Sequence, residues 1–98
     1  MRSTVAALPT FDELRRYVHQ TLCQHDHLDP AAAPMRQALI KRSGRPCGLL
    51  FQVQGPRALR TWAIWAADEH RILFYDSAGS RIAETRLCDS PDPLKLAA

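Results

Sequence analysis

Residues 47–87 carry the pattern that most constrains the fold of this chain. Four short runs rich in apolar and aromatic residues alternate there with turn-forming residues. Runs of this length between turn signals are typical of β-strands. The spacing predicts four strands in one antiparallel meander, over Leu49–Gln54, Arg60–Ala67, Arg71–Asp76 and Ser80–Leu87.

Two short connections set the register of the last three strands. Residues 77–79 read Ser-Ala-Gly, and a three-residue loop with glycine third suits a type I turn closed by a left-handed residue. Residues 68–70 are interpreted as a second three-residue loop. With these lengths Ile64 faces Phe74, and Phe74 faces Ile82.

This register assigns each side chain to one of two sheet faces. The face expected to form the core collects Phe51, Val53, Trp62, Ile64, Ile72, Phe74 and Ile82. The opposite, outer face collects Leu50, Gln52, Gln54, Ala63, Trp65, Leu73, Tyr75 and Arg81. The assignment depends on the loop lengths, because a one-residue slip moves a strand's whole set to the other face.

The segment before the strands has helical signals. Thr10 and Glu13 fit a capping box, in which the threonine hydroxyl accepts a backbone N–H and the glutamate reaches back. Apolar residues then follow at steps of three and four, as on one face of a helix: Phe11, Leu14, Val18 and Leu22. This first helix is expected to end near residues 25–27, ahead of Pro30.

A second helix is predicted between Pro30 and Gly44. Asp29 could cap it with Pro30 at its first position, although Pro34 would then lie inside the helix and lack a donor. The alternative start is residue 33 or 34, with the helix running to Gly44, a favoured residue just past a helix end.

The predicted fold is therefore α+β, with two N-terminal helices on one face of a four-stranded antiparallel meander. A chain of 98 residues has room for a single core. The domain is expected to span residues 10–88, with residues 1–9 and 89–98 as flexible or loosely packed ends.

Charge is distributed unevenly along the chain, whose net charge is +3. No acidic residue occurs between Pro30 and Ala67, and this segment contains six basic residues: Arg36, Lys41, Arg42, Arg45, Arg57 and Arg60. Such segregation can indicate an anionic partner. These six residues are the candidates for contacts with nucleic acid or another anion.

Potential metal ligands gather at the end of the first helix: His19, Cys23, His25 and His27. Structural zinc usually needs two ligand pairs from separate elements, and the second pair is missing here. We therefore expect no metal and no other cofactor. Catalytic motifs are missing as well, because no serine elbow and no glycine-rich phosphate loop occurs.

These observations favour a small non-enzymatic binding module, which associates with itself or with a protein partner through the outer face. The candidate contact residues are Gln52, Trp65, Leu73, Tyr75 and Arg81. The alternative is a nucleic-acid-binding domain, in which aromatic rings of this face stack on bases and the basic residues hold phosphates. A metal-binding or enzymatic protein is less favoured.

The sequence also bears on location. No apolar run approaches the roughly 20 residues of a membrane span, and no signal peptide is recognisable. Three cysteines are an odd number with no paired spacing, unlike a secreted disulfide framework. We expect a cytoplasmic protein without membrane contact.

Overall fold

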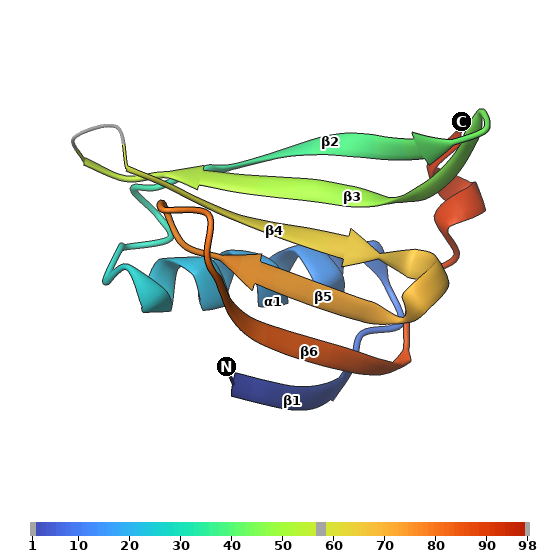
Figure 1. Ribbon diagram of the computed structural model, residues 1–98, viewed down its shortest axis with the longest axis horizontal. Helices are drawn as coiled ribbons and strands as arrows, with labels where there is room; N and C mark the ends of the chain where they lie inside the picture. Colours follow the sequence, from blue (N-terminus) through green and yellow to red (C-terminus); the bar gives the residue numbers. More distant parts are fainter. Residues whose placement is uncertain (1, 57–58, 98) are drawn as a thin grey trace.

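The computed structural model describes residues 2–56 and 59–97, and it has one α-helix packed on a six-stranded mixed sheet (Figure 1). The strand order is β1-β6-β5-β4-β3-β2. β1 runs parallel to β6, and all other neighbours are antiparallel. The elements are β1 (Arg2–Ala7), α1 (Phe11–His25), β2 (Met35–Arg42), β3 (Arg45–Gln54), β4 (Arg60–Ala66), η2 (Ala67–Glu69), β5 (Arg71–Tyr75), β6 (Arg81–Asp89) and η3 (Pro93–Ala97).

The order of the strands explains where the helix lies. β1 and β2 are at opposite edges of the sheet, so the chain must cross one sheet face between them, and α1 makes this crossing. The chain then returns strand by strand from β2 to β6. Figure 1 shows α1 behind the sheet, with the other face uncovered toward the viewer.

The predicted first helix is confirmed. The backbone N–H of Glu13 donates to Thr10 Oγ1 over 3.2 Å, which satisfies one of the free donors at a helix start. Leu14, Val18 and Leu22 are fully buried against the sheet. Burial of such a stripe, more than helix propensity, stabilises a helix of this length.

The predicted second helix is wrong, since residues 35–42 form β2, an edge strand paired with β3. Ser43 and Gly44 both have positive φ, 53° and 76°, which is the backbone of a two-residue type I′ hairpin. Six of the eight side chains of β2 are exposed, so the strand shows no alternation. The apolar residues Met35, Ala38 and Leu39 imitated a helical spacing instead.

The four-stranded antiparallel sheet is also wrong, because β1 and β2 extend it to six strands of mixed direction. Residues 2–7, expected to lie outside the folded domain, pair with β6. The N–H of Leu8 continues this pairing by donating to the carbonyl of Asp89 over 2.9 Å. At the other end of the chain Leu96, in η3, packs against the core.

The register between β4 and β5 differs from the prediction by one residue. The connection has four residues, 67–70. They are the three residues of η2 and then His70, which has the left-handed conformation with φ 54°. Trp65 therefore pairs with Ile72. This single extra residue moves the whole β4 set to the opposite face, so that Trp65 is fully buried and Trp62 lies on the outer face.

The predicted turn between β5 and β6 is confirmed. Gly79 has φ 84°, and its N–H donates to the carbonyl of Asp76 over 3.0 Å. The pairing beyond the turn is nevertheless shifted by a β-bulge, so Phe74 pairs with Ala83 rather than with Ile82. A bulge of this kind could not be predicted from the loop length.

The core lies between α1 and the covered sheet face. Its largest fully buried side chains are Trp65, Phe51, Phe74, Leu14, Leu22, Leu49, Ile72, Val18 and Val53. The ring of Phe11 meets that of Trp65 edge to face, with centroids 5.9 Å apart. This geometry is favoured for aromatic pairs.

Candidate interaction surface on the outer sheet face

The outer face is the sheet face opposite α1, and three rows of cross-strand neighbours form it. The central row is mainly apolar: Ala38, Leu50, Ile64, Leu73 and Glu84. On one side of it lies the aromatic row: Arg36, Gln52, Trp62, Tyr75 and Arg81. On the other side lies the small row: Ile40, Gly48, Ala66, Arg71 and Arg86.

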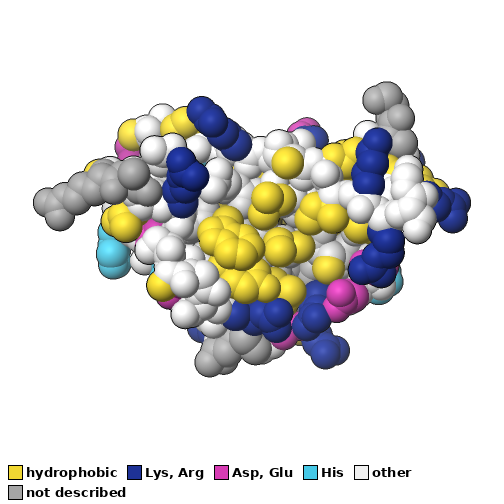
Figure 2. All heavy atoms as spheres, turned by 45° about the horizontal axis from the view of Figure 1, so that its top comes forward, with side chains coloured by type: hydrophobic (Ala, Val, Ile, Leu, Met, Phe, Trp, Pro, Cys, Tyr) yellow, Lys and Arg dark blue, Asp and Glu magenta, His cyan; other side chains and the backbone are white. Residues whose placement is uncertain are grey.

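Apolar side chains are contiguous at the middle of this face. Figure 2 shows hydrophobic side chains gathered at its centre, with Lys and Arg side chains around them. We call this the apolar patch, and it consists of Ala38, Leu50, Trp62, Ile64, Leu73 and Tyr75. Leu73 is buried among the others, and the remaining five are at least partly exposed. Leu50 is 36% exposed, which is unusual for a large apolar side chain at the centre of a sheet. Contiguous exposed apolar area usually marks an interface.

The aromatic side chains of the patch stand on edge. Trp62 and Tyr75 stack with their centroids 4.2 Å apart and 9° between planes. Because they lie on neighbouring strands, rings stacked in this way stand upright on the sheet and present edges to solvent. Arg81, the next neighbour of Tyr75, has its guanidinium carbon 5.7 Å from the tyrosine centroid and donates to the hydroxyl over 3.2 Å.

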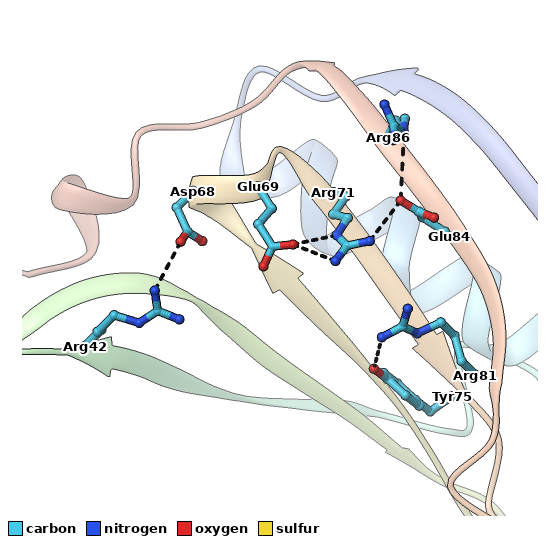
Figure 3. A network of polar contacts seen from close by, with 8 residues as sticks. All are labelled: Arg42, Asp68, Glu69, Arg71, Tyr75, Arg81, Glu84 and Arg86. Atoms are coloured by element: carbon cyan, nitrogen blue, oxygen red, sulfur yellow. Dashed lines mark hydrogen bonds and ion pairs between the residues drawn. The ribbon is translucent and has the colours of Figure 1, made fainter.

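A network of charged side chains borders the small row (Figure 3). Arg71 contacts Glu69 at 2.6 Å and Glu84 at 3.4 Å. The hydrogen bond with Glu69, and to a smaller extent the one with Glu84, raises the pKa of the Arg71 guanidinium above its ordinary value. Arg42 pairs with Asp68 at 3.7 Å, across the connection that follows β4.

The structure places four of the five predicted contact residues on the outer face: Gln52, Leu73, Tyr75 and Arg81. Of these four, Leu73 is only 7% exposed. Trp65 is the exception, because it is fully buried beneath α1, and its assignment to the binding surface is wrong. Trp62, which sequence reasoning put in the core, takes its place beside Tyr75. Only the length of the β4–β5 connection could have distinguished the two tryptophans.

Most of the predicted anion-binding residues lie on the β2–β3 hairpin. Arg36, Lys41, Arg42 and Arg45 are all exposed there, and Arg60 opens β4. Arg57 lies outside the described residues. The hairpin thus concentrates positive charge at one edge of the sheet.

The four potential metal ligands are not brought together. His19 Nε2 donates to the carbonyl of Ala33 over 2.7 Å, Cys23 is fully buried, and His25 and His27 are exposed. Across residues 2–56 and 59–97, no group of three or more His, Cys, Asp or Glu side chains is arranged to hold a metal ion.

Within the described residues no helix combines the length and the apolar character that crossing a membrane requires. Comparison of the chain with protein-family models, with curated proteins and with solved structures gave no match.

Proposed function

We propose that this protein is a small, non-enzymatic binding module that pairs with a second copy of itself through the outer face. The observation that carries the proposal is the arrangement of large and small side chains around the central apolar row. The aromatic row is bulky, the small row contains Gly48 and Ala66, and the two flank the same axis.

Two sheets that pack face to face keep their strands within about 30° of each other, roughly 10 Å apart. A two-fold axis along the central row would lay the aromatic row of one copy over the small row of the other. On β4, residues equally spaced from Ile64 then face each other, so Trp62 lies over Ala66. On β3 the same operation, centred on Leu50, puts Gln52 over Gly48. Large side chains would thus meet small ones, which favours dense packing.

On β5 the polar neighbours fit the same arrangement, whereas on β6 it brings Arg81 of one copy near Arg86 of the other, a like-charge contact between two solvent-exposed side chains. On β5, the operation centred on Leu73 puts Tyr75 of one copy over Arg71 of the other, and a guanidinium near an aromatic ring is attractive. Since a two-fold interface uses the same patch twice, each of these contacts occurs twice.

The size of the face is sufficient for a stable dimer. The molecule measures 35 × 26 × 24 Å, and Figure 1, viewed down the shortest axis, looks onto the uncovered sheet. A standard interface buries about 800 Å² on each partner, which a face of these dimensions can supply. The patch is apolar at its centre and charged at its rim, as in many protein interfaces.

Nucleic-acid binding is the second candidate, and the exposed basic hairpin of β2 and β3 favours it. The aromatic row argues against base stacking, however. Tyr75 lies between Trp62 and Arg81, so its ring faces are already occupied. A nucleic-acid complex would therefore rest on phosphate contacts by the hairpin, and it would weaken steeply with salt.

The test is solution mass by light scattering during size-exclusion chromatography. The parent is expected to be dimeric, and Trp62→Ala and Ala66→Trp are each expected to shift it to monomer. The double variant Trp62→Ala/Ala66→Trp restores the large-over-small match and should recover the dimer. Leu94→Ala, which truncates an exposed leucine of η3 that is not part of the patch, is the matched control and should remain dimeric.

Two results would refute the proposal. A parent that stays monomeric at every concentration rules out self-association. If that monomer gains mass only when mixed-sequence DNA or RNA is added, and loses it again in salt, the result favours nucleic-acid binding. A double variant that stays monomeric, while both single variants are monomers, rejects the two-fold axis along the central row.

A further inference from the structure

We infer that the protein has a ligand site separate from the outer face: an open cleft on the covered side of the sheet that takes a small carboxylate with an apolar body. The cleft encloses about 500 Å³ between α1 and the strands β1, β5 and β6. This volume is within the usual range for small-molecule sites. The site lies on the side of the sheet opposite the proposed dimer contact and goes beyond it.

The cleft has an apolar part formed by both walls. Leu22 lines it from the helix, and Phe74, Ile82 and Ala83 line it from the sheet. The bulge that shifts the β5–β6 register also places Ile82 here, and bulges often re-aim side chains beside functional sites. Leu22 and Phe74 are fully buried, so the apolar area that a ligand could cover belongs to Ile82 and Ala83, which are partly exposed. Covering it with an alkyl chain or aromatic ring is favourable at about 25 cal/mol per Å² of apolar area.

Three hydroxyl groups converge in the same cleft. Thr85 Oγ1 lies 2.9 Å from Tyr17 Oη and 2.9 Å from Thr4 Oγ1, whereas Thr4 and Tyr17 are 3.4 Å apart. The two short hydrogen bonds use two of the three hydroxyl hydrogens. The third hydrogen can make the longer contact between Thr4 and Tyr17, so it is the one that could turn to donate to an oxygen of a ligand instead. The ring of Phe74, with its centroid 6.4 Å from that of Tyr17, helps to hold the phenol in place.

Charge selects the kind of head group. Arg2 and His25 line the cleft, and among the described residues no Asp or Glu side chain does. A guanidinium is charged at every accessible pH and suits a carboxylate. The helix end at His25 would ordinarily repel an anion. Here its carbonyls are already capped, because the N–H groups of Asp26, His27 and Leu28 donate to Leu22, Gln24 and Cys23.

Together these features define an amphipathic ligand. Its apolar body would lie against Ile82 and Ala83, and its carboxylate would accept a hydrogen bond from a hydroxyl of the cluster while facing Arg2. Acids of the size of decanoate fit this description. An alcohol of the same length lacks the charge, and an alkylammonium ion reverses it.

The experiment is a titration followed by ¹H–¹⁵N correlation NMR, with decanoate, decanol and decyltrimethylammonium as probes. Binding of decanoate is expected to reach saturation and to shift the amide resonances of Tyr17, Thr21, Phe74 and Thr85. Decanol should bind about tenfold more weakly, and decyltrimethylammonium should not bind. The same titration on the Trp62→Ala variant shows whether binding depends on the outer face.

Three variants make the test specific. Arg2→Gln, at an exposed position, should weaken decanoate about tenfold and leave decanol unchanged. Ala83→Leu fills the apolar part and should weaken both probes. Arg86→Gln is the matched control, since Arg86 lies on β6, the strand of Ala83, but on the outer face. This variant should change neither the affinity for decanoate nor that for decanol.

Several outcomes would overturn the inference. These are shifts confined to Trp62 and Tyr75, equal affinity for decanoate and decanol, or the absence of saturation at millimolar decanoate. Retained binding to the Trp62→Ala variant, by contrast, supports the cleft even if the parent proves monomeric. Failure of the dimer and failure of the cleft are therefore distinguishable.

Discussion

The two tryptophans of β4 are expected to differ sharply in their contribution to stability. Trp65 is fully buried, and its ring packs edge to face on Phe11, so Trp65→Ala removes a large buried surface and leaves a cavity. Such substitutions cost about 3–5 kcal/mol, against a total of roughly 5–15 kcal/mol for a typical domain. Trp62→Ala removes a half-buried ring and one stacking partner, for which we expect about 1 kcal/mol in the folding of the monomer, apart from the association free energy that the proposed dimer would lose.

Trp65→Phe separates volume from polarity at the same site. Within the described residues Trp65 Nε1 is buried without a hydrogen-bond partner, and an unsatisfied buried donor costs about 1–3 kcal/mol. Phenylalanine removes this donor while keeping most of the ring, so Trp65→Phe should cost much less than Trp65→Ala. The measurement is urea unfolding followed by circular dichroism. Equal losses of unfolding free energy for Trp62→Ala and Trp65→Ala would refute the four-residue connection between β4 and β5 and the register that follows from it.

Two further predictions concern glycine and cysteine. Gly48→Ala should destabilise the protein by about 3 kcal/mol or prevent folding, because the new Cβ would lie 2.0 Å from the carbonyl oxygen of Trp65. Gly44→Ala, in open space at φ 76°, should cost only about 1 kcal/mol. Similar urea unfolding midpoints for the two variants would contradict this prediction. Burial, aided by Asp29 and Asp26, raises the pKa of the Cys23 thiol above its usual 9.0. The folded state therefore holds this proton more tightly than the unfolded state, and stability should fall as the pH rises above about 9. Cys23→Ala should remove this part of the alkaline loss, and identical pH profiles of the urea midpoint in parent and variant would contradict the assignment.

The features that could be predicted from the sequence are those decided by neighbouring residues. The start of α1 depends on Thr10 and Glu13, three positions apart, and the last turn depends on Gly79 at a positive φ. In both cases the residue that fixes the backbone lies inside the segment it fixes. The alternation within β3 was equally readable, because this strand is central and buries one side chain in two along much of its length.

The features that could not be predicted are decided by distant residues or by one unit of loop length. β1 becomes a strand through parallel pairing with β6, more than 75 residues away, and β2 is an edge strand whose exposed side chains show no period. The dipeptide Ser43–Gly44 was the one local signal for the first hairpin, and it fits a helix end as well as a turn. Beyond β4, a connection of four residues rather than three exchanged Trp62 and Trp65.

The topology explains why both proposed sites exist. The connections β2–β3 and β4–β5 contain two and four residues, so they cannot cross a sheet face. The outer face is thus left uncovered by these connections, although its central row is apolar. On the other side, a single helix about 10 Å in diameter covers a sheet of six strands, which is about 24 Å wide at 4.8 Å per strand. The helix therefore cannot reach every strand, and the cleft beside β1 and β6 is the corner that it leaves open.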